Sequence, residues 1–312
     1  MWGKKSGKSV YDIIAEKLVS LMDQTNLLPW QMPWKKIKGK NSCAGFVSGA
    51  TGKEYDFLNN LLLFIQGGEE GRYFTFNGAK KLGMQIKKGA KGKIIKGSTV
   101  LDREMRNENG ELVRDKHGRV RVEKVFVLRY WTVFHESDIE GYENKEPELP
   151  PAVPLMKVES AEVVSNNYLS REKITLVRGG NKAFFRPSED LIQLPEDGQF
   201  EGKTNEFYST LFHEMVHSTG TENRLNRKSL VGATTTENYA KDELCAEIGA
   251  AYLCGLTDTA SESSLNNSAA YIKTWKERIT KDPKALVIAF AQAEKAVNFI
   301  VNGRNETGDG DE

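Results

Sequence analysis

Two histidines and a glutamate stand at helical spacing in the stretch TLFHEMVHSTG, residues 210–220. If this stretch is a helix, His213 and His217 project from one face about 6 Å apart along the axis, and two imidazole nitrogens so placed can share one Zn²⁺. Glu214 projects about 100° around the helix from that face, so it cannot coordinate the ion as the two histidines do. It can, however, reach a metal-bound water and act as a general base. We therefore predict His213 and His217 as zinc ligands and Glu214 as the catalytic residue. The alternative is two polar residues on a helix without a metal.

A catalytic zinc site needs a third protein ligand, and the segment NYAKDELCAEIGAAYLCG offers two carboxylates. Glu243 and Glu247 are four residues apart and share one side of a predicted helix. The run from Glu243 to Glu247, ELCAE, resembles the E-x-x-A-D/N pattern of gluzincin-type proteases, and this resemblance implies Glu243 as the third ligand and Glu247 as a carboxylate that orients a ligating imidazole. The exchange of these two roles, or two solvated charges without a metal, remain the alternatives. Tyr271 is a candidate for stabilising an oxyanion, with a role in the core as the alternative.

The helices that must carry these residues are predicted from apolar periodicity at roughly 205–219, 238–254, 268–281 and 283–301. Thr204 is the predicted N-cap of the first. One strand, DLIQLP, precedes it, and in the first half of the chain helices are predicted in VYDIIAEKLVSLMDQ and FLNNLLLFIQGG. The runs GKIIKGSTVL and KVFVLRYWTVF read as strands of a small sheet, joined by a charged turn region.

The net charge of +1 hides two halves of opposite sign. Residues 1–150 hold 26 basic and 19 acidic side chains, whereas the remainder holds 18 and 24. A basic half favours a polyanionic partner. Lysines and aromatic rings are dense in this half, and unpaired bases stack on exposed rings for about 1–3 kcal/mol each. The predicted contacts to single-stranded DNA are Lys80, Lys81, Lys87, Lys88, Lys91, Lys93, Lys96, Tyr73, Phe74, Phe76, Trp30 and Trp34. The alternative is that the rings belong to the core and the lysines to a solvated face.

Length and composition indicate two domains of an α+β protein. The segment GYENKEPELPPAVPLMKV holds four of the nine prolines and is predicted to be an extended linker. We expect a small mixed α/β DNA-binding domain over 1–142, a linker over 143–158, a mainly helical metal-binding domain over 159–303 and a disordered tail over 304–312. Three cysteines without a C-x-x-C pair argue against a disulfide framework or a thiolate zinc cluster. No signal peptide or membrane-spanning run is predicted, so we expect a cytoplasmic bacterial protein with no membrane partner.

The order of these features resembles the ArdC antirestriction proteins of conjugative plasmids and related mobile elements. The matching pieces are LPWQMPW, FLNNLLL, YFTFNGAKKLGMQIKKGAKGKIIKG, YWTVFHESDIEG, AFFRPSEDLIQLP, FYSTLFHEMVHSTG, NRLNR, YAKDELCAEIGAAYLCG and AAYIKTWKERI. The resemblance implies an N-terminal domain that binds single-stranded DNA, followed by a zincin-like metallopeptidase domain of the gluzincin type, with HExxH and a glutamate as the Zn²⁺ ligands. This sequence departs from the family pattern at Thr221, where a histidine is common, and at His135, where asparagine is usual.

Three classes of function follow from these observations. The first is an antirestriction protein of a mobile element, which binds single-stranded or double-stranded DNA and cleaves a protein such as a host restriction enzyme. The second is a pure DNA-binding accessory protein of replication or conjugation, with a structural or inactive zinc site. The third is an interaction scaffold whose metal site has decayed.

Overall fold

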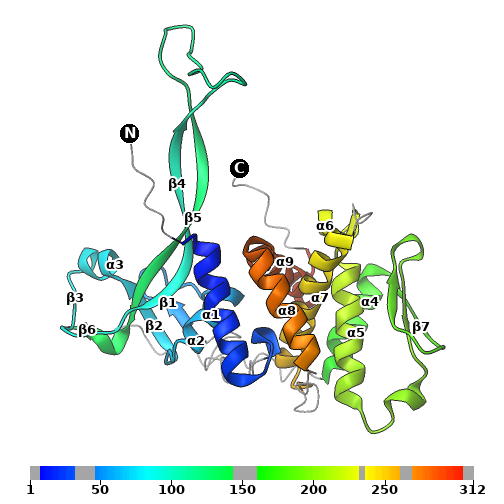
Figure 1. Ribbon diagram of the computed structural model, residues 1–312. Coiled ribbons are helices and arrows are strands. Elements are labelled where there is room, and N and C mark those ends of the chain that lie inside the picture. The colour runs from blue at the N-terminus through cyan, green and yellow to red at the C-terminus, as the bar shows by residue number, and fades with distance from the viewer. Residues whose placement is uncertain (1–7, 32–45, 143–159, 232–235, 261–268, 305–312) are drawn as a thin grey trace.

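The computed structural model describes residues 8–31, 46–142, 160–231, 236–260 and 269–304 (Figure 1). The predicted linker over 143–158, the predicted DNA contact Trp34 and nearly all of the predicted tail lie outside these residues. The chain is α+β, as predicted. The N-terminal half of the chain forms a region with a four-stranded sheet, and the C-terminal half forms a mainly helical region (Figure 1).

The N-terminal region is built around one mixed sheet with strand order β1-β2-β5-β4, in which only β1 and β2 are parallel. Its helices are α1 (Val10–Thr25), α2 (Phe57–Ile65) and α3 (Phe76–Lys81). Its strands are β1 (Phe46–Ser48), β2 (Gly71–Thr75), β3 (Gln85–Ile86), β4 (Lys93–Glu104), β5 (Val122–His135) and β6 (Ile139–Glu140). A capping box between Ser9 and Asp12 starts α1. The side chain of each residue accepts a hydrogen bond from the backbone N–H of the other.

Strands β4 and β5 pair over twelve positions and extend far beyond the rest of the sheet as a two-stranded ribbon (Figure 1). The base of the ribbon is fixed by side chains of α2. Asn59 and Gln66 each donate to and accept from one residue of β4, Lys96 and Ile94 respectively, at 2.8–3.0 Å. These side-chain amides bond backbone groups of β4 that a further strand would otherwise pair with at the edge of the sheet. They therefore fix the direction in which the ribbon leaves the body.

The ribbon ends in two turns of the same construction, eight residues apart. Asn107 and Asp115 each accept two backbone N–H bonds, and the arginine before each donates to the carbonyl of a glycine with positive φ, Gly110 or Gly118. These glycines adopt a backbone conformation that other residues rarely take. This short repetition was missed in the sequence analysis, which predicted only a charged turn region.

The C-terminal region joins a three-stranded sheet, with order β7-β9-β8, to a group of helices. Its strands are β7 (Thr175–Arg178), β8 (Phe184–Arg186) and β9 (Leu191–Leu194). Its helices are α4 (Ser160–Glu172), α5 (Thr204–Ser218), α6 (Lys228–Val231), α7 (Thr236–Leu256), α8 (Ala269–Lys281) and α9 (Pro283–Asn302). The four long helices α5, α7, α8 and α9 lie where periodicity predicted them. Thr204 is not the N-cap of α5: Lys203 holds that position without a side-chain bond, and Thr204 begins the helix.

One hydrophobic core runs through both regions. Helix α1 packs on α8 and α9. The Trp30 ring meets the edge of Trp275 at 5.4 Å between centroids, and Phe57 stacks on Tyr252 at 3.6 Å. Helix α9 is long and apolar enough to cross a membrane by composition, but half of that stretch is buried within the fold. The two regions are therefore packed against each other through large apolar side chains.

Candidate metal centre

Helices α5 and α7 bring His213, His217 and Glu243 together. The two imidazole Nε2 atoms are 3.1 Å apart, and the Glu243 carboxylate oxygens lie 3.5 Å from Nε2 of His213 and 3.4 Å from that of His217. The helices can approach because Gly249 faces Val216, where a Cβ would lie 2.8 Å from a methyl group. Helix α7 therefore packs closely on α5 at Gly249.

The three side chains can offer ligand atoms to one divalent ion, because one such atom of each lies within 4.8 Å of the others. Ligands at about 2.1 Å from a tetrahedral centre stand about 3.4 Å from one another. Each Glu243 oxygen lies at about this distance from one imidazole nitrogen, while the two nitrogens are somewhat closer, at 3.1 Å. The donor set of two imidazoles and one carboxylate is also that of open catalytic sites, which keep a fourth position for water.

Asp242 orients His217. Its Oδ2 lies 2.6 Å from Nδ1 of His217, and since hydrogen bonds to His217 and Arg227 overcome burial and hold the Asp242 pKa at about 2, the imidazole must be the donor. When a metal ion displaces the proton on Nε2, the proton that Asp242 holds on Nδ1 leaves the Nε2 lone pair free for that ion. Burial acts to lower the pKa of His217, but the bonds to Asp242 and Glu243 outweigh it and raise the pKa to about 9.

Arg227 holds Asp242 in place from the other side. Both side chains are almost fully buried, and Arg227 Nε donates to Asp242 Oδ1 at 2.9 Å. Its remaining donors bind the Val216 carbonyl at the end of α5 and the Thr219 hydroxyl, and Ser229 also donates to Asp242. One guanidinium therefore ties the end of the histidine helix to the carboxylate on α7.

Glu214 is buried beside this cluster. Burial raises the pKa of its carboxyl group, while the neighbouring histidines and a backbone hydrogen bond from Phe185 of β8 lower it. The edge strand of the small sheet thus contacts the predicted base directly.

Glu247 does not take the orienting role that the sequence predicted. Its Oε1 accepts a hydrogen bond from the Tyr271 hydroxyl of α8 at 2.8 Å, and the carboxylate on His217 is Asp242 instead. The pKa of Tyr271 is raised, first by burial and then by the charge of Glu247. Asp242 and Arg227 were not predicted as site residues. Asp242 could have been found from its position next to the predicted ligand Glu243. Arg227 lies in the NRLNR segment, but the local sequence does not distinguish a buried arginine from an exposed one.

The predicted DNA contacts differ in their exposure: most of the described rings are buried, and most of the lysines are exposed. Trp30, Tyr73 and Phe74 are at most 1% exposed, so the prediction that they form stacking platforms on the surface is wrong: they fill the core. Phe76 is 59% exposed. The exposed lysines are Lys80, Lys81, Lys87, Lys88 and Lys91, while Lys93 and Lys96 are half-buried. Lys96 forms an ion pair with Asp56, and the Lys87 ammonium donates to the Ser137 carbonyl.

His135 has a structural role outside the metal site. Its Nδ1 lies 2.8 Å from the Ser137 hydroxyl and its Nε2 lies 3.1 Å from the Glu70 carbonyl. The unusual histidine therefore joins the end of β5 to the loop before β2.

The fold and the donor set define a zincin-like metal centre carried by helices, behind a separate N-terminal region. Comparison with known families agrees in both halves. Residues 164–292 match the zincin-like metallopeptidase family, and residues 8–134 match the N-terminal domain of the anti-restriction factor ArdC. The chain is an ArdC-like protein, with these two domains in this order.

Several individual proteins are similar over nearly the whole chain. A DNA primase TraC of Escherichia coli is 32% identical over 94% of this chain, and a second is 31% identical over the same share. The chain spans only 20% and 27% of these two relatives. The Mn(II)-bound crystal structure of the antirestriction ArdC protein from plasmid R388 superposes with a TM-score of 0.65 at 22% identity, covering 96% of this chain and all of that one. That likeness shows a shared fold.

Proposed function

We propose that this chain is an antirestriction protein of a mobile element, which binds single-stranded DNA through its N-terminal domain and carries a Zn²⁺-dependent peptidase site. The observation that carries the proposal is that ligand atoms of His213, His217 and Glu243 lie within 4.8 Å of one another beside the buried Glu214. The DNA-binding part is supported by the basic N-terminal half and by the match to the ArdC N-terminal domain. We place the protein in the bacterial cytoplasm, where a restriction enzyme or another host protein would be its substrate.

In this proposal His213, His217 and Glu243 would hold the divalent ion, which would supply a water of lowered pKa and polarise the carbonyl group of the substrate. The Glu214 carboxylate would act as the general base toward that water and would return the proton to the departing amine nitrogen. Asp242 keeps the proton of His217 on Nδ1, so that Nε2 stays available as a ligand. The Tyr271 hydroxyl is the candidate donor to the developing oxyanion, and because its single O–H bonds Glu247, that bond must break before it can donate to an oxyanion.

The test is Glu214→Gln in the full chain, because this change keeps the side-chain volume and removes the base. We expect about one zinc per chain by elemental analysis, as in the wild type, together with loss of peptide cleavage and of protection against restriction. Protection that survives intact would exclude proteolysis as its mechanism. Wild-type protein without stoichiometric metal would support the decayed scaffold instead.

A second candidate is an accessory role in conjugative DNA replication, with a structural or inactive metal site. The similarity to two proteins named DNA primase TraC over 94% of this chain favours it. This function requires DNA binding and metal but no cleavage, so Glu214→Gln should leave it unchanged.

A further inference from the structure

The ribbon formed by β4 and β5 exposes large apolar side chains to solvent. Phe126 is 77% exposed, Tyr130 50% and Trp131 38%. Three aliphatic side chains of the same two strands are also exposed, namely Val100, Leu101 and Val122. Exposed apolar side chains gathered on one element commonly mark a binding surface. Because the ribbon projects from the body, both its faces are accessible (Figure 1).

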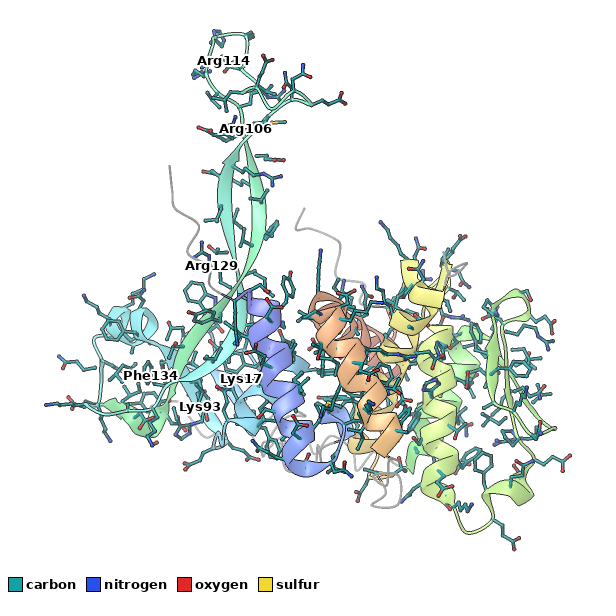
Figure 2. All side chains as sticks on the ribbon, viewed as in Figure 1. Lys17, Lys93, Arg106, Arg114, Arg129 and Phe134 are labelled. Atoms are coloured by element: carbon teal, nitrogen blue, oxygen red, sulfur yellow. The ribbon has the colours of Figure 1, made fainter. Side chains whose placement is uncertain are left out.

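The charges of this element are those of a surface for an anionic partner. Residues 93–135 hold ten basic and six acidic side chains. Arg103 pairs with Glu123, and Arg119 pairs with Asp115. Lys124 and Arg129 have no ion-pair partner among the described residues, although both are exposed. Figure 2 shows Arg129 where the ribbon leaves the body, with Arg106 and Arg114 at its far end.

Each of these cations is next to an exposed ring. Side chains alternate between the faces of a strand, so Lys124 shares a face with Phe126, and Arg129 shares the opposite face with Trp131. In each case the two positions are two residues apart, about 7 Å along the strand. The Trp131 indole is held across Gly97, where a Cβ would come within 2.1 Å of its Nε1. A ring and a cation at this spacing can take a base and a phosphate of one strand.

We propose that the β4–β5 ribbon is the surface on which an unpaired nucleic-acid strand stacks. On one face of the ribbon bases lie on Phe126 and Tyr130 with a phosphate against Lys124, and on the other face a base lies on Trp131 with a phosphate against Arg129. This inference rests on the proposed DNA-binding function and gives it a location. It replaces the buried rings Trp30, Tyr73 and Phe74, which the sequence suggested, with rings that solvent reaches. Single strands are favoured over duplex because stacking requires bases whose faces are free.

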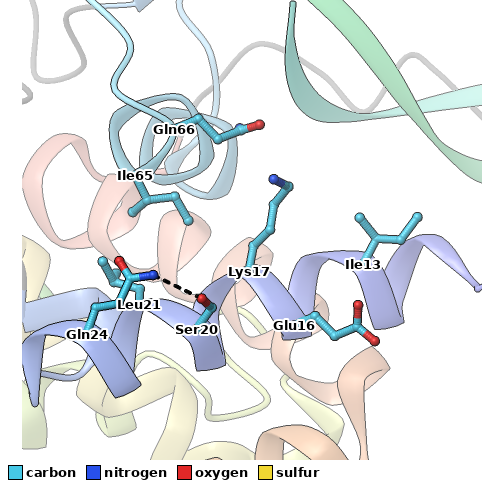
Figure 3. A pocket seen from close by; sticks show the side chains of 8 residues that line it. All are labelled: Ile13, Glu16, Lys17, Ser20, Leu21, Gln24, Ile65 and Gln66. Atoms are coloured by element: carbon cyan, nitrogen blue, oxygen red, sulfur yellow. Dashed lines mark hydrogen bonds between the residues drawn. The ribbon is translucent and has the colours of Figure 1, made fainter.

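A groove beside the base of the ribbon extends this surface toward the body. It has a volume of about 360 Å³ and lies between α1 and α2, with Lys17 and Gln66 among its lining residues (Figure 3). The same Gln66 binds the backbone of Ile94 in β4, so the groove adjoins the ribbon. Lys17 has no ion-pair partner among the described residues and points across the groove (Figure 3). It can therefore bind a phosphate of a strand that continues from the ribbon.

The test measures binding of a labelled oligo-dT strand to the full-length chain by fluorescence anisotropy across a salt series. Phe126→Ala is expected to weaken binding about 5- to 150-fold, and Phe126→Leu should weaken it almost as much because it keeps hydrophobicity but loses the ring. Arg129→Gln should reduce the slope of log affinity against log salt by about one phosphate contact. Ile288→Ala, at an exposed aliphatic position of α9 rather than of the ribbon, is the control and should bind as the wild type. Thermal unfolding confirms that each variant is folded.

The outcomes separate the ribbon from DNA binding itself. If Phe126→Ala binds like the wild type while Lys87→Gln with Lys88→Gln loses affinity, DNA binding stands and the ribbon is the wrong surface. If the wild type does not bind DNA at all, the proposed function fails, and this inference with it. Equal affinity for duplex would overturn the preference for unpaired strands. A wild-type dimer that becomes monomeric in Phe126→Ala, with unchanged DNA affinity, would make the ribbon a contact between copies of the chain.

Discussion

The change Asp242→Asn tests how the metal centre is held together. Asp242 is 1% exposed and accepts from both His217 and Arg227. An asparagine of the same shape has one acceptor and one donor, so it cannot accept from both partners. If its NH₂ group faces His217, the ring must move its proton to Nε2 and lose the lone pair that binds the metal. We expect divalent-metal affinity to fall about 10- to 100-fold, as for other residues that orient a ligating histidine.

The same change breaks a buried ion pair. Removing one partner of such a pair costs about 3–5 kcal/mol, because the remaining charge stays buried without compensation. We therefore expect metal-free Asp242→Asn to lose unfolding free energy of this order in urea titrations. Metal affinity is measured by competition with a chelator in calorimetry.

Glu247→Gln is the matched control, since it makes the same chemical change one turn further along α7. Its carboxylate accepts from Tyr271, so we expect metal affinity close to that of the wild type. The reasoning is refuted if Asp242→Asn binds metal like the wild type, or if Glu247→Gln is the weaker binder of the two.

Two further predictions concern stability. Burial, and then the charge of Asp56, raises the pKa of Glu294 from 4.5 to about 7, so the folded protein binds an extra proton in this interval and its stability should fall as pH rises from 4.5 to about 7. Glu294→Gln should remove that part of the pH dependence in urea unfolding, and an unchanged profile would contradict the assignment. Gly249→Ala places a Cβ 2.8 Å from Val216 and should lower the unfolding free energy by about 1–3 kcal/mol. The control Gly198→Ala meets nothing within 4 Å and should leave the melting temperature unchanged; equal losses would show that the contact is not tight.

The helices and the ligand candidates were predictable because both depend on spacing along the chain. A period of 3.6 residues gave the positions of α5 and α7, and the intervals between His213 and His217 and between Glu243 and Glu247 gave the faces. The choice between Glu243 and Glu247 followed from the resemblance, since both carry the same group on the same face. In the structure Glu243 is the one near both histidines.

The strands β7 and β8 of the C-terminal sheet were missed because they are short and only partly buried. A run of three or four residues is too brief for a period to show. These strands nevertheless bring Phe185 against Glu214. The aromatic residues show a similar limit: Tyr73 and Tyr130 have the same character in sequence, but one is buried and the other exposed.

The sequence by itself determined the chemistry of this protein: a helix with two histidines and a glutamate, a second helix with a candidate third ligand, and a basic N-terminal half. These features are present in the structure as predicted, because local spacing controls which side chains share a face. Only the tertiary structure decided which carboxylate orients His217, which aromatic rings solvent can reach, and that the two domains share one core. These properties depend on contacts between residues distant in the chain, and the burial of Arg227 between α5 and Asp242 of α7 is the clearest case.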